Sequence, residues 1–300
     1  MSQLNPETVE DFIEYGMKAC EEAEVFLGHG TDSMWDEVLV LVLHVLNLPI
    51  TSDRNILQNT LTHEQKEAVL ALIKRRINER IPACYLINES WFCGLSFYVD
   101  ERVIIPRSPI AECIEHGFAP WIDPAKVANI LDVCTGSGCM AIASAYAFEE
   151  AHVDAIDISE EALAVAEINV DKHSLNERVT LIQSDLLSKV PNKKYDVIMS
   201  NPPYVSDAEM SELPGEFLHE PDLALRAEDD GLALAFSLMK QAQARLSEHG
   251  ILIIEVGNSA QALHDRHPDW PLTWLDFERG GDGVFLLTKP QLDVVLASMG

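Results

Sequence analysis

The chain is short of positive charge. Against 49 aspartates and glutamates it has only 21 lysines and arginines, so its formal net charge is −28. A surface of this sign repels phosphate backbones and offers a nucleic acid strand no cationic path. It attracts basic partners and speeds their encounter at low salt. We therefore expect a basic protein as partner and no direct contact with nucleic acid, although acidity that serves only solubility or a salt-rich habitat explains the charge equally well.

Long apolar runs, a secretion signal and closely paired cysteines are also missing. His44 and Asn47 interrupt the apolar run at residues 38–48, which falls short of the ~18 residues needed to cross a bilayer. The acidic N-terminus lacks the basic and apolar regions of a signal peptide. None of the 6 cysteines stands in C-x-x-C spacing, and Cys134 and Cys139 have no histidine cluster beside them. These absences predict a cytoplasmic protein with free thiols, no membrane contact and no metal site.

The most informative stretch is Asn201-Pro202-Pro203-Tyr204, which directly follows the strand-like residues 196–200. The prolines cannot donate to a sheet, and they stiffen the loop that leaves the strand. A rigidly held Asn201 carboxamide beside proline carbonyls supplies hydrogen-bond acceptors that can orient a planar NH2 group, and Tyr204 supplies a flat wall. The motif therefore predicts a site for an amino or amide nitrogen, unless it is only a turn that ends a strand.

A second motif lies upstream, where the apolar residues 130–133 run into a loop containing Gly136 and Gly138. Glycines permit positive φ angles and let a ligand approach the loop and the N-terminus of the next helix. The third glycine of the dinucleotide fingerprint is missing, because Ala141 stands in its place. Asp132 at the strand end would repel a pyrophosphate but suits a ligand with an ammonium group. S-adenosylmethionine carries both an ammonium and a sulfonium.

Acidic residues also follow the next two predicted strands. Asp157 follows residues 153–156, where a carboxylate can bind both hydroxyls of a ribose. Asp185 follows residues 179–184 and either contacts an adenine amino group or is an ordinary surface acid. Since ligands of open α/β sheets bind at the carboxyl ends of the strands, these residues predict an S-adenosylmethionine site. The residues predicted to bind this cofactor are Asp132, Cys134, Thr135, Gly136, Ser137, Gly138, Asp157, Asp185, Leu186 and Asn201.

Strand and helix patterns alternate through the last two thirds of the chain, as in a mostly parallel sheet. The predicted strands lie near residues 130, 153, 179, 197 and 251–256, and the predicted helices lie near 140, 160–172 and 231–246. Residues 272–277 and 284–288, separated by glycines, predict a closing hairpin.

The first third has no strong strand pattern. It predicts three helices, one starting near Val9, one over 38–48 and one over 59–81, with Thr62 and Gln65 as a capping box.

The motifs, in this order, resemble those of the class I S-adenosylmethionine-dependent methyltransferases, and specifically the HemK-like N5-glutamine methyltransferases. The carrying residues are Asp132-x-Cys134-Thr135-Gly136-Ser137-Gly138, Asp157, Asp185 and Asn201-Pro202-Pro203-Tyr204. Residues 101–112 are similar to the linker signature of that family, and residues 219–225 with Asp230-Gly231 are similar to its loop after the catalytic motif. The likeness is strong over the last two thirds of the chain and general over the first.

The resemblance implies an α/β fold: a Rossmann-like class I methyltransferase domain with a mostly parallel sheet and a C-terminal antiparallel hairpin, plus a small N-terminal helical domain. The predicted boundaries are 1–86 for the helical domain, 87–107 for a β-hairpin linker and 108–300 for the methyltransferase domain. The alternating residues 91–97 with a central glycine mark that hairpin.

Within this family, the branch that modifies peptide-chain release factors usually shows Pro-Arg-Pro, an acidic residue and Thr. This chain has Pro106-Arg107-Ser108-Pro109-Ile110, which is similar to the branch that methylates a glutamine of protein three of the large ribosomal subunit. Leu186 is a second departure, because the release-factor branch can carry an aromatic residue there near the adenine. The predicted substrate is therefore the ribosomal protein, and release factors are the alternative.

The predicted chemistry is direct methyl transfer to a glutamine side-chain amide, with Asn201, Pro202 and Tyr204 as catalytic residues. Asn201, Pro202, Pro203, Tyr204 and Arg107 are predicted to bind the substrate, although a salt bridge of the linker would explain Arg107 as well. A DNA adenine-N6 methyltransferase shares a similar loop but needs a cationic path for the strand. A non-catalytic ribosome-assembly factor is a further alternative, which the intact acceptor and cofactor motifs disfavour.

Overall fold

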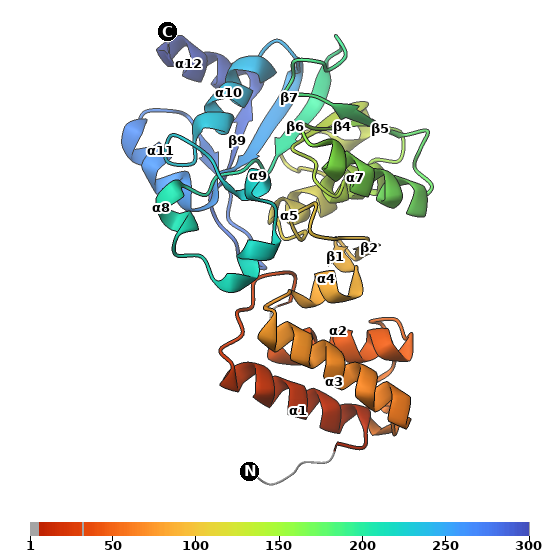
Figure 1. Cartoon of the computed structure of the whole chain (residues 1–300). Coiled ribbons are helices and arrows are strands. Elements are labelled where there is room, and N and C mark those ends of the chain that lie inside the picture. The colour runs from red at the N-terminus through yellow and green to blue at the C-terminus, as the bar shows by residue number, and fades with distance from the viewer. Residues whose placement is uncertain (1–5, 32, 300) are drawn as a thin grey trace. The chain divides into compact units, whose positions relative to one another are not determined.

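The computed structural model describes residues 6–31 and 33–299 (Figure 1). The chain forms two compact units. One comprises the described residues up to Ser90 and also includes Pro214–His219, and the other comprises Trp91–Leu213 and the described residues from Glu220 onward. A short segment that lies far along the sequence is therefore part of the N-terminal unit, an arrangement that the sequence motifs did not indicate.

The N-terminal unit is helical, as predicted. Its elements are α1 (Val9–Glu22), α2 (Met34–Leu46), the 3-10 helix η1 (Arg54–Gln58), α3 (His63–Asn78), α4 (Ala83–Ile87) and the 3-10 helix η3 (Gly215–His219). Gly16 allows α1 to lie close to α2, since a Cβ atom at this position would stand 2.5 Å from Val38 Cγ1. The predicted capping box of Thr62 and Gln65 is confirmed, and it starts α3 later than predicted. No helix in the part of the chain that is described is long and apolar enough to span a membrane.

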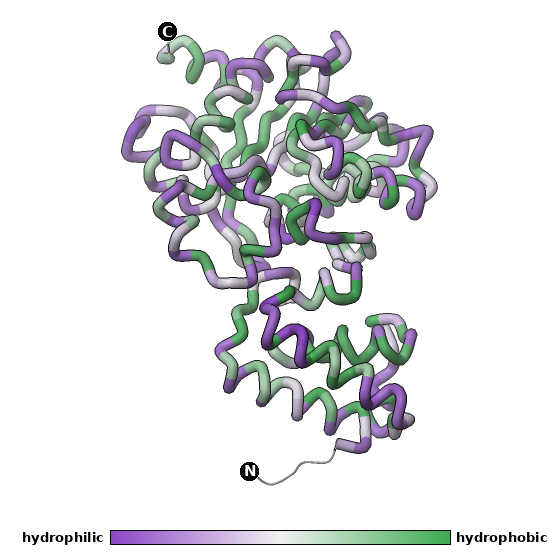
Figure 2. The backbone as a smooth tube through the Cα atoms, in the orientation of Figure 1, coloured by the Kyte–Doolittle hydropathy of each residue, from purple (hydrophilic) through white to green (hydrophobic). Residues whose placement is uncertain are grey.

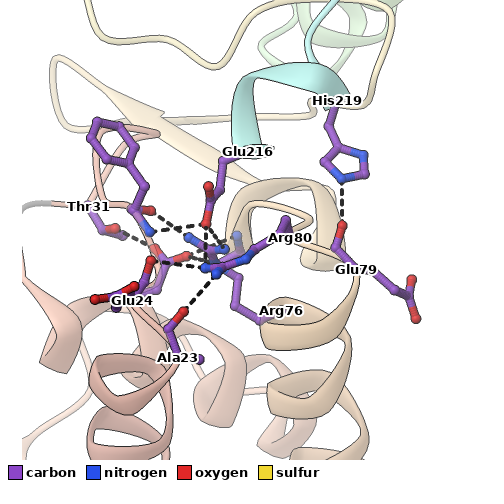
Figure 3. A network of polar contacts seen from close by, with 11 residues as sticks. Ala23, Glu24, Thr31, Arg76, Glu79, Arg80, Glu216 and His219 are labelled. Carbon is purple, nitrogen blue, oxygen red and sulfur yellow. Dashed lines mark hydrogen bonds and ion pairs between the residues drawn. The ribbon is translucent and has the colours of Figure 1, made fainter. Parts of the chain in front are cut away.

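A buried ionic network ties η3 to the helices of this unit (Figure 3). Arg76 of α3 is 1 % exposed, and it pairs with Glu37 of α2 and, at 3.1 Å, with Glu216 of η3. Glu216 Oε1 also accepts from the backbone N–H of Phe26 at 3.0 Å and lies 3.4 Å from Arg80 Nη1. Because buried charges are tolerated only when they are paired and hydrogen bonded, Glu216 and Arg76 each need the other.

Replacing Glu216 with alanine is expected to destabilise the helical unit by about 3–5 kcal/mol, because it leaves the buried Arg76 short of one partner. Calorimetry and hydrogen exchange of the α1–α3 amides measure this effect. Glu212→Ala removes an exposed carboxylate from the same loop and is the matched control, with a change under about 0.5 kcal/mol expected. Equal exchange rates in the two variants would contradict a structural role for the network.

The second unit contains the sheet. Its strands are β1 (Ser90–Phe92), β2 (Leu95–Phe97), β3 (Asn129–Val133), β4 (His152–Asp157), β5 (Val179–Gln183), β6 (Tyr195–Ser200), β7 (Leu246–Glu255), β8 (Thr273–Trp274) and β9 (Val284–Thr288). Its α-helices are α5 (Ile110–Glu115), α6 (Cys139–Ala147), α7 (Glu160–Lys172), α8 (Asp207–Met210), α9 (Asp222–Leu225), α10 (Ala233–Ala242), α11 (Ala260–Arg266) and α12 (Lys289–Met299), with the 3-10 helices η2 (Pro124–Lys126) and η4 (Gly257–Ser259).

The seven-stranded sheet has the order β5-β4-β3-β6-β7-β9-β8. The strands β5, β4, β3, β6 and β7 pair in parallel, and β9 pairs antiparallel with both β7 and β8. The predicted mostly parallel sheet and its closing antiparallel hairpin are confirmed. The crossovers place all carboxyl ends of β3 to β6 at one edge of the sheet.

The central strands β3 and β6 are buried along nearly their whole length, as expected for parallel strands covered on both faces. Figure 2 shows the hydropathy of the chain along the same path. Neighbouring residues of one strand point to opposite faces and enter different cores. Ile130 lies in the core covered by α5, α6 and α7, whereas Leu131 lies in the core covered by α10 and α12. The central strands are therefore rigidly supported from both sides.

Some predicted boundaries are wrong. The helix predicted over 231–246 is α10 (Ala233–Ala242), because Gly231 has a left-handed φ of 84° and Leu246 already pairs with Tyr195 in the sheet. The helix predicted over 59–81 is shorter, because Thr60 forms a β-bridge with Thr8 before the cap at Thr62.

Candidate functional site

The registers of the parallel strands bring the predicted residues into one row. Val133 of β3 lies opposite Ser200 of β6, and the Ser200 hydroxyl donates to the Val133 carbonyl at 2.8 Å. The residues that follow, Cys134 and Asn201, therefore leave the sheet next to each other. On the other side of β3, Val133 lies opposite Ile156, so that Asp157 follows at the same level. The sheet edge thus places the glycine loop between Asp157 and Asn201.

Asp132 of β3 is hydrogen bonded to the glycine loop and to the start of the helix that follows it. Its side chain is fully buried, and its Oδ2 accepts from the Thr135 hydroxyl at 2.6 Å and from the Ala141 N–H at 3.1 Å. Burial raises the pKa of Asp132 to about 7, against the lowering effect of these two hydrogen bonds. Its Oδ1 has no hydrogen-bond partner among the described residues.

Asp157 joins the loop to β4. Its Oδ2 accepts from the Gly136 N–H at 2.9 Å and its Oδ1 from the Ser159 N–H at 3.0 Å. Burial raises the pKa of Asp157, while these backbone donors act in the opposite direction. Each carboxylate oxygen keeps a lone pair that a hydroxyl donor could use.

The acceptor loop leaves β6 directly at the same edge. Asn201 is half-buried, Pro202 is buried, and Pro203 and Tyr204 are half-buried. Tyr204 is held from several sides: its hydroxyl donates to Glu255 Oε1 at 3.0 Å, and its carbonyl accepts from the Ser259 hydroxyl at 3.2 Å. The loop is therefore fixed both at the strand and at its far end.

One cavity connects most of these elements. It is partly open to solvent and is lined by residues of the linker, the glycine loop, the ends of β4 and β5, and the acceptor loop. Of the residues predicted to bind cofactor or substrate, those that line it are Cys134, Gly136, Asp157, Asp185, Leu186, Asn201 and Pro203. Those that lie outside the lining are Asp132, Thr135, Ser137, Gly138, Pro202, Tyr204 and Arg107. The structure thus brings the predicted cofactor loop and acceptor loop to a shared space.

The residues outside the lining act on the loops in ways that the structure shows. Gly138 has a left-handed φ of 80° and begins α6, and a Cβ atom there would stand 3.3 Å from Ala166 Cβ. The Ser137 carbonyl accepts from Asn169 Nδ2 at 2.9 Å. The predicted direct contacts of Asp132, Thr135, Ser137 and Gly138 with the cofactor stay predictions.

Arg107 forms the linker salt bridge that the sequence left open. Its guanidinium pairs with both carboxylate oxygens of Glu220, and Nη2 lies 2.7 Å from Oε2. Glu220 Oε1 also accepts from the Ile105 N–H at 3.0 Å, and its side chain is fully buried. The predicted contact of Arg107 with a substrate stays a prediction, while Glu220 holds the linker to the loop after the acceptor motif.

Sequence reasoning missed several residues of the cavity wall. Arg102, Val103 and Ile104 come from the linker, and Pro221, Leu223 and Ala224 come from the loop after the acceptor motif. Both stretches contributed to the family resemblance. The sequence did not indicate, however, that their residues line the cavity. The available signal was that both stretches are proline-containing loops next to predicted site residues.

The two thiols near the cavity lie in surroundings that disfavour the thiolate. All 6 cysteines are free. Burial raises the pKa of Cys134 and raises that of Cys139 to about 12, so both stay protonated at neutral pH. Within residues 6–31 and 33–299, no group of three or more His, Cys, Asp or Glu side chains could hold a metal ion.

Comparison with known proteins finds methyltransferases at the level of domain family, curated relatives and solved structures. Residues 118–230 match the Methyltransferase small domain family. The ribosomal protein uL3 glutamine methyltransferase of Francisella tularensis is 45% identical over 96% of this chain and 92% of its own length. The ribosomal protein uL3 glutamine methyltransferase of Bordetella pertussis is also 45% identical, over 96% of this chain and 97% of its own length. Among solved structures, ribosomal protein L11 methylase from Lactobacillus delbrueckii is 21% identical, with a TM-score of 0.40 over 60% of this chain and 75% of that chain.

Proposed function

The chain belongs to the family of ribosomal protein uL3 glutamine methyltransferases, and we propose that it transfers a methyl group from S-adenosylmethionine to a glutamine side-chain amide of uL3. The observation that supports this most directly is the shared cavity, which Asn201 and Pro203 of the acceptor loop line together with Gly136 of the glycine loop and Asp157 at the end of β4. The family agrees with the branch predicted from residues 106–110 and does not favour the release-factor alternative.

The cavity has the features that S-adenosylmethionine needs. Gly136 leaves open space, since no atom lies within 4 Å of a Cβ atom built there. Asp157 and Asp185 supply acceptors for ribose hydroxyls and an adenine amino group, and Leu186 supplies an apolar wall. The unpartnered Asp132 Oδ1 is a further acceptor close to the loop. When bound, the cofactor supplies a methyl carbon activated by its sulfonium.

The acceptor loop prepares the substrate nitrogen. An amide nitrogen is a poor nucleophile, because its lone pair is delocalised into the carbonyl. In our proposal the Asn201 side-chain oxygen and the Pro202 carbonyl accept its two N–H groups, and Tyr204 lies against the amide plane. Accepting from both N–H groups orients the nitrogen and favours a transition state in which it becomes positive. The new N–C bond forms as the C–S bond breaks, and the surplus proton leaves to an acceptor or to water.

The charge of the chain suits this substrate. With a net charge of −28, the protein attracts a basic ribosomal protein and repels nucleic acid. We propose that it binds uL3 before the latter is buried in rRNA, and hence acts in the cytoplasm without direct contact to nucleic acid. Release factors remain substrates to be tested.

Replacing Asp157 with alanine is expected to weaken S-adenosylmethionine binding by at least about tenfold, because charge-assisted hydrogen bonds to a ribose are each worth roughly 1.5–3 kcal/mol. Titration calorimetry measures the dissociation constant directly. The control is Asp171→Asn, which changes an exposed residue of α7. Asp154 is unsuitable for this purpose, because it is buried in the sheet. Unchanged affinity of Asp157→Ala would reject the ribose contact.

The decisive test of the function offers the protein a radiolabelled methyl donor with separate uL3, release factors and DNA. Label is expected in uL3 only, and peptide mass spectrometry should place the methyl group on a glutamine side chain. Label in release factors alone would overturn the substrate, and label in DNA would overturn the reaction.

A further inference from the structure

A buried carboxylate behind the acceptor loop takes no part in the chemistry described above. Glu255 ends β7 and is 5 % exposed. Its Oε1 accepts from the Tyr204 hydroxyl at 3.0 Å, and its Oε2 accepts from the Ser108 hydroxyl at 2.6 Å. Burying a carboxylate costs free energy unless hydrogen-bond donors satisfy it. Here each oxygen of Glu255 has its own donor, which fixes the orientation of the carboxylate.

Tyr204 depends on this arrangement for its direction. One side of its ring lies against Gly257, where a Cβ atom would stand only 2.5 Å from Tyr204 Cε2. Gly257 itself has a left-handed φ of 46° and lies against Gly283. The ring is thus placed by a glycine surface, and its hydroxyl points into the protein and not into the cavity. The orientation of the ring along that surface is set by the hydrogen bond to Glu255.

We propose that Glu255 is a positioning residue for the methyl transfer, which fixes the Tyr204 ring and thereby holds the adjoining Asn201–Pro203 segment in the conformation that orients the substrate amide. Ser108 occupies the second oxygen and keeps the carboxylate in place. This inference rests on the proposed function. It gives Ser108, one of the residues that mark the branch, a structural task.

The ionisation of Glu255 makes the role observable. Burial raises the pKa of Glu255 to about 7, Arg107 and the two hydroxyl donors lower it, and Asp282 raises it. Above this pKa the carboxylate accepts from both hydroxyls. Below it, one oxygen carries a proton, and the bonds lose their charge-assisted character. Positioning should therefore improve as the pH rises through about 7.

Stability depends on pH in the opposite direction. Because the folded pKa of Glu255 lies above its usual value of 4.5, the folded state binds more protons between these two values. The contribution of this group to stability is full below about 4.5 and is lost as the pH rises through about 7. A rise of activity over the same interval cannot then come from the contribution of Glu255 to stability.

The test compares kcat, KM for uL3 and cofactor affinity in wild type, Glu255→Leu, Glu255→Gln and the control Asp282→Asn. Glu255→Leu is expected to lower kcat about 10- to 100-fold, since small misplacements cost rate steeply, with cofactor affinity within about twofold. Glu255→Gln keeps the shape of the side chain and therefore serves as the second variant in case Glu255→Leu folds poorly. It should lose the rise of activity near pH 7. Asp282→Asn, which changes an exposed carboxylate, should keep that rise but move it to lower pH, because Asp282 raises the pKa of Glu255.

A second measurement needs no methyl transfer. With 13C-labelled tyrosine rings and Tyr204→Phe to assign the signal, the Tyr204 resonance should be sharp in wild type and shifted or broadened in Glu255→Leu. If the ring signal responds but uL3 is not methylated by wild type, the proposed function is wrong while the control of Tyr204 by Glu255 stands. An unchanged ring signal, or a Glu255→Gln enzyme with wild-type kcat and an intact rise near pH 7, would overturn the inference.

Discussion

Replacing Asn201 with alanine is expected to lower turnover on uL3 by about 100-fold or more, while the affinity for S-adenosylmethionine changes far less. Asn201 lines the cavity directly after β6, and among the described residues no hydrogen bond engages its side chain. Its carboxamide oxygen is thus available to the substrate. Removal of one preorganised hydrogen-bond donor of an oxyanion hole typically costs about 10²–10³ in kcat, and we expect a loss of the same order for a preorganised acceptor.

The matched control is Asn201→Asp, which keeps the shape and an acceptor oxygen but loses the amide donor. It should retain more turnover than Asn201→Ala, since the proposed contact uses the oxygen. Single-turnover rates separate the chemical step from binding and release. Wild-type turnover in Asn201→Ala would refute the amide-orienting scheme, and a loss of cofactor affinity as large as the loss in turnover would move Asn201 to a cofactor role.

The parts of the site that follow from local pattern were predictable. Asp132, Asp157 and Asn201 stand at or directly after the ends of predicted parallel strands. Because parallel strands end at one edge of the sheet, these three residues were expected to lie near one another. The registers of β3 with β4 and β6 confirm that neighbourhood. The sequence alone therefore placed the cofactor loop beside the acceptor loop without any knowledge of their three-dimensional contacts.

The parts that depend on distant contacts were not predictable. The Tyr204 hydroxyl reaches Glu255, 51 residues away, and Arg107 reaches Glu220, 113 residues away. No spacing rule links such residues, because the pairing arises only when the sheet is assembled. Glu216 is the extreme case, since it lies 140 residues from Arg76 in a segment that no motif assigned to the helical unit.

These distant contacts also fix the chain that follows the acceptor motif. The chain between Tyr204 and Glu220 is held at both ends, because Glu255 holds Tyr204 and Glu220 pairs with Arg107 of the linker. Between them, Pro214–His219 belongs to the helical unit.

Replacing Gly231 with alanine is expected to be the most damaging glycine substitution near the site. Gly231 has a φ of 84°, and a Cβ atom there would stand 2.1 Å from the Tyr204 carbonyl oxygen and 2.2 Å from Ser259 Oγ. Both neighbours belong to the hydrogen bond that holds Tyr204, and the first is backbone, so that relief requires the acceptor loop to move. We expect a loss of about 3 kcal/mol or more in stability and at least about tenfold in turnover.

Gly280→Ala separates this overlap from backbone strain. Gly280 has nearly the same φ, 83°, but no atom lies within 4 Å of a Cβ atom built there. Its substitution should therefore show only the left-handed penalty of about 1–2 kcal/mol, with turnover within about twofold of wild type. Thermal unfolding and turnover measured side by side test the difference. If both variants behaved alike, the close approach of Gly231 to Tyr204 would not be what fixes the acceptor loop, and its rigidity would have to come from the prolines and from the hydrogen bond of Tyr204 to Glu255.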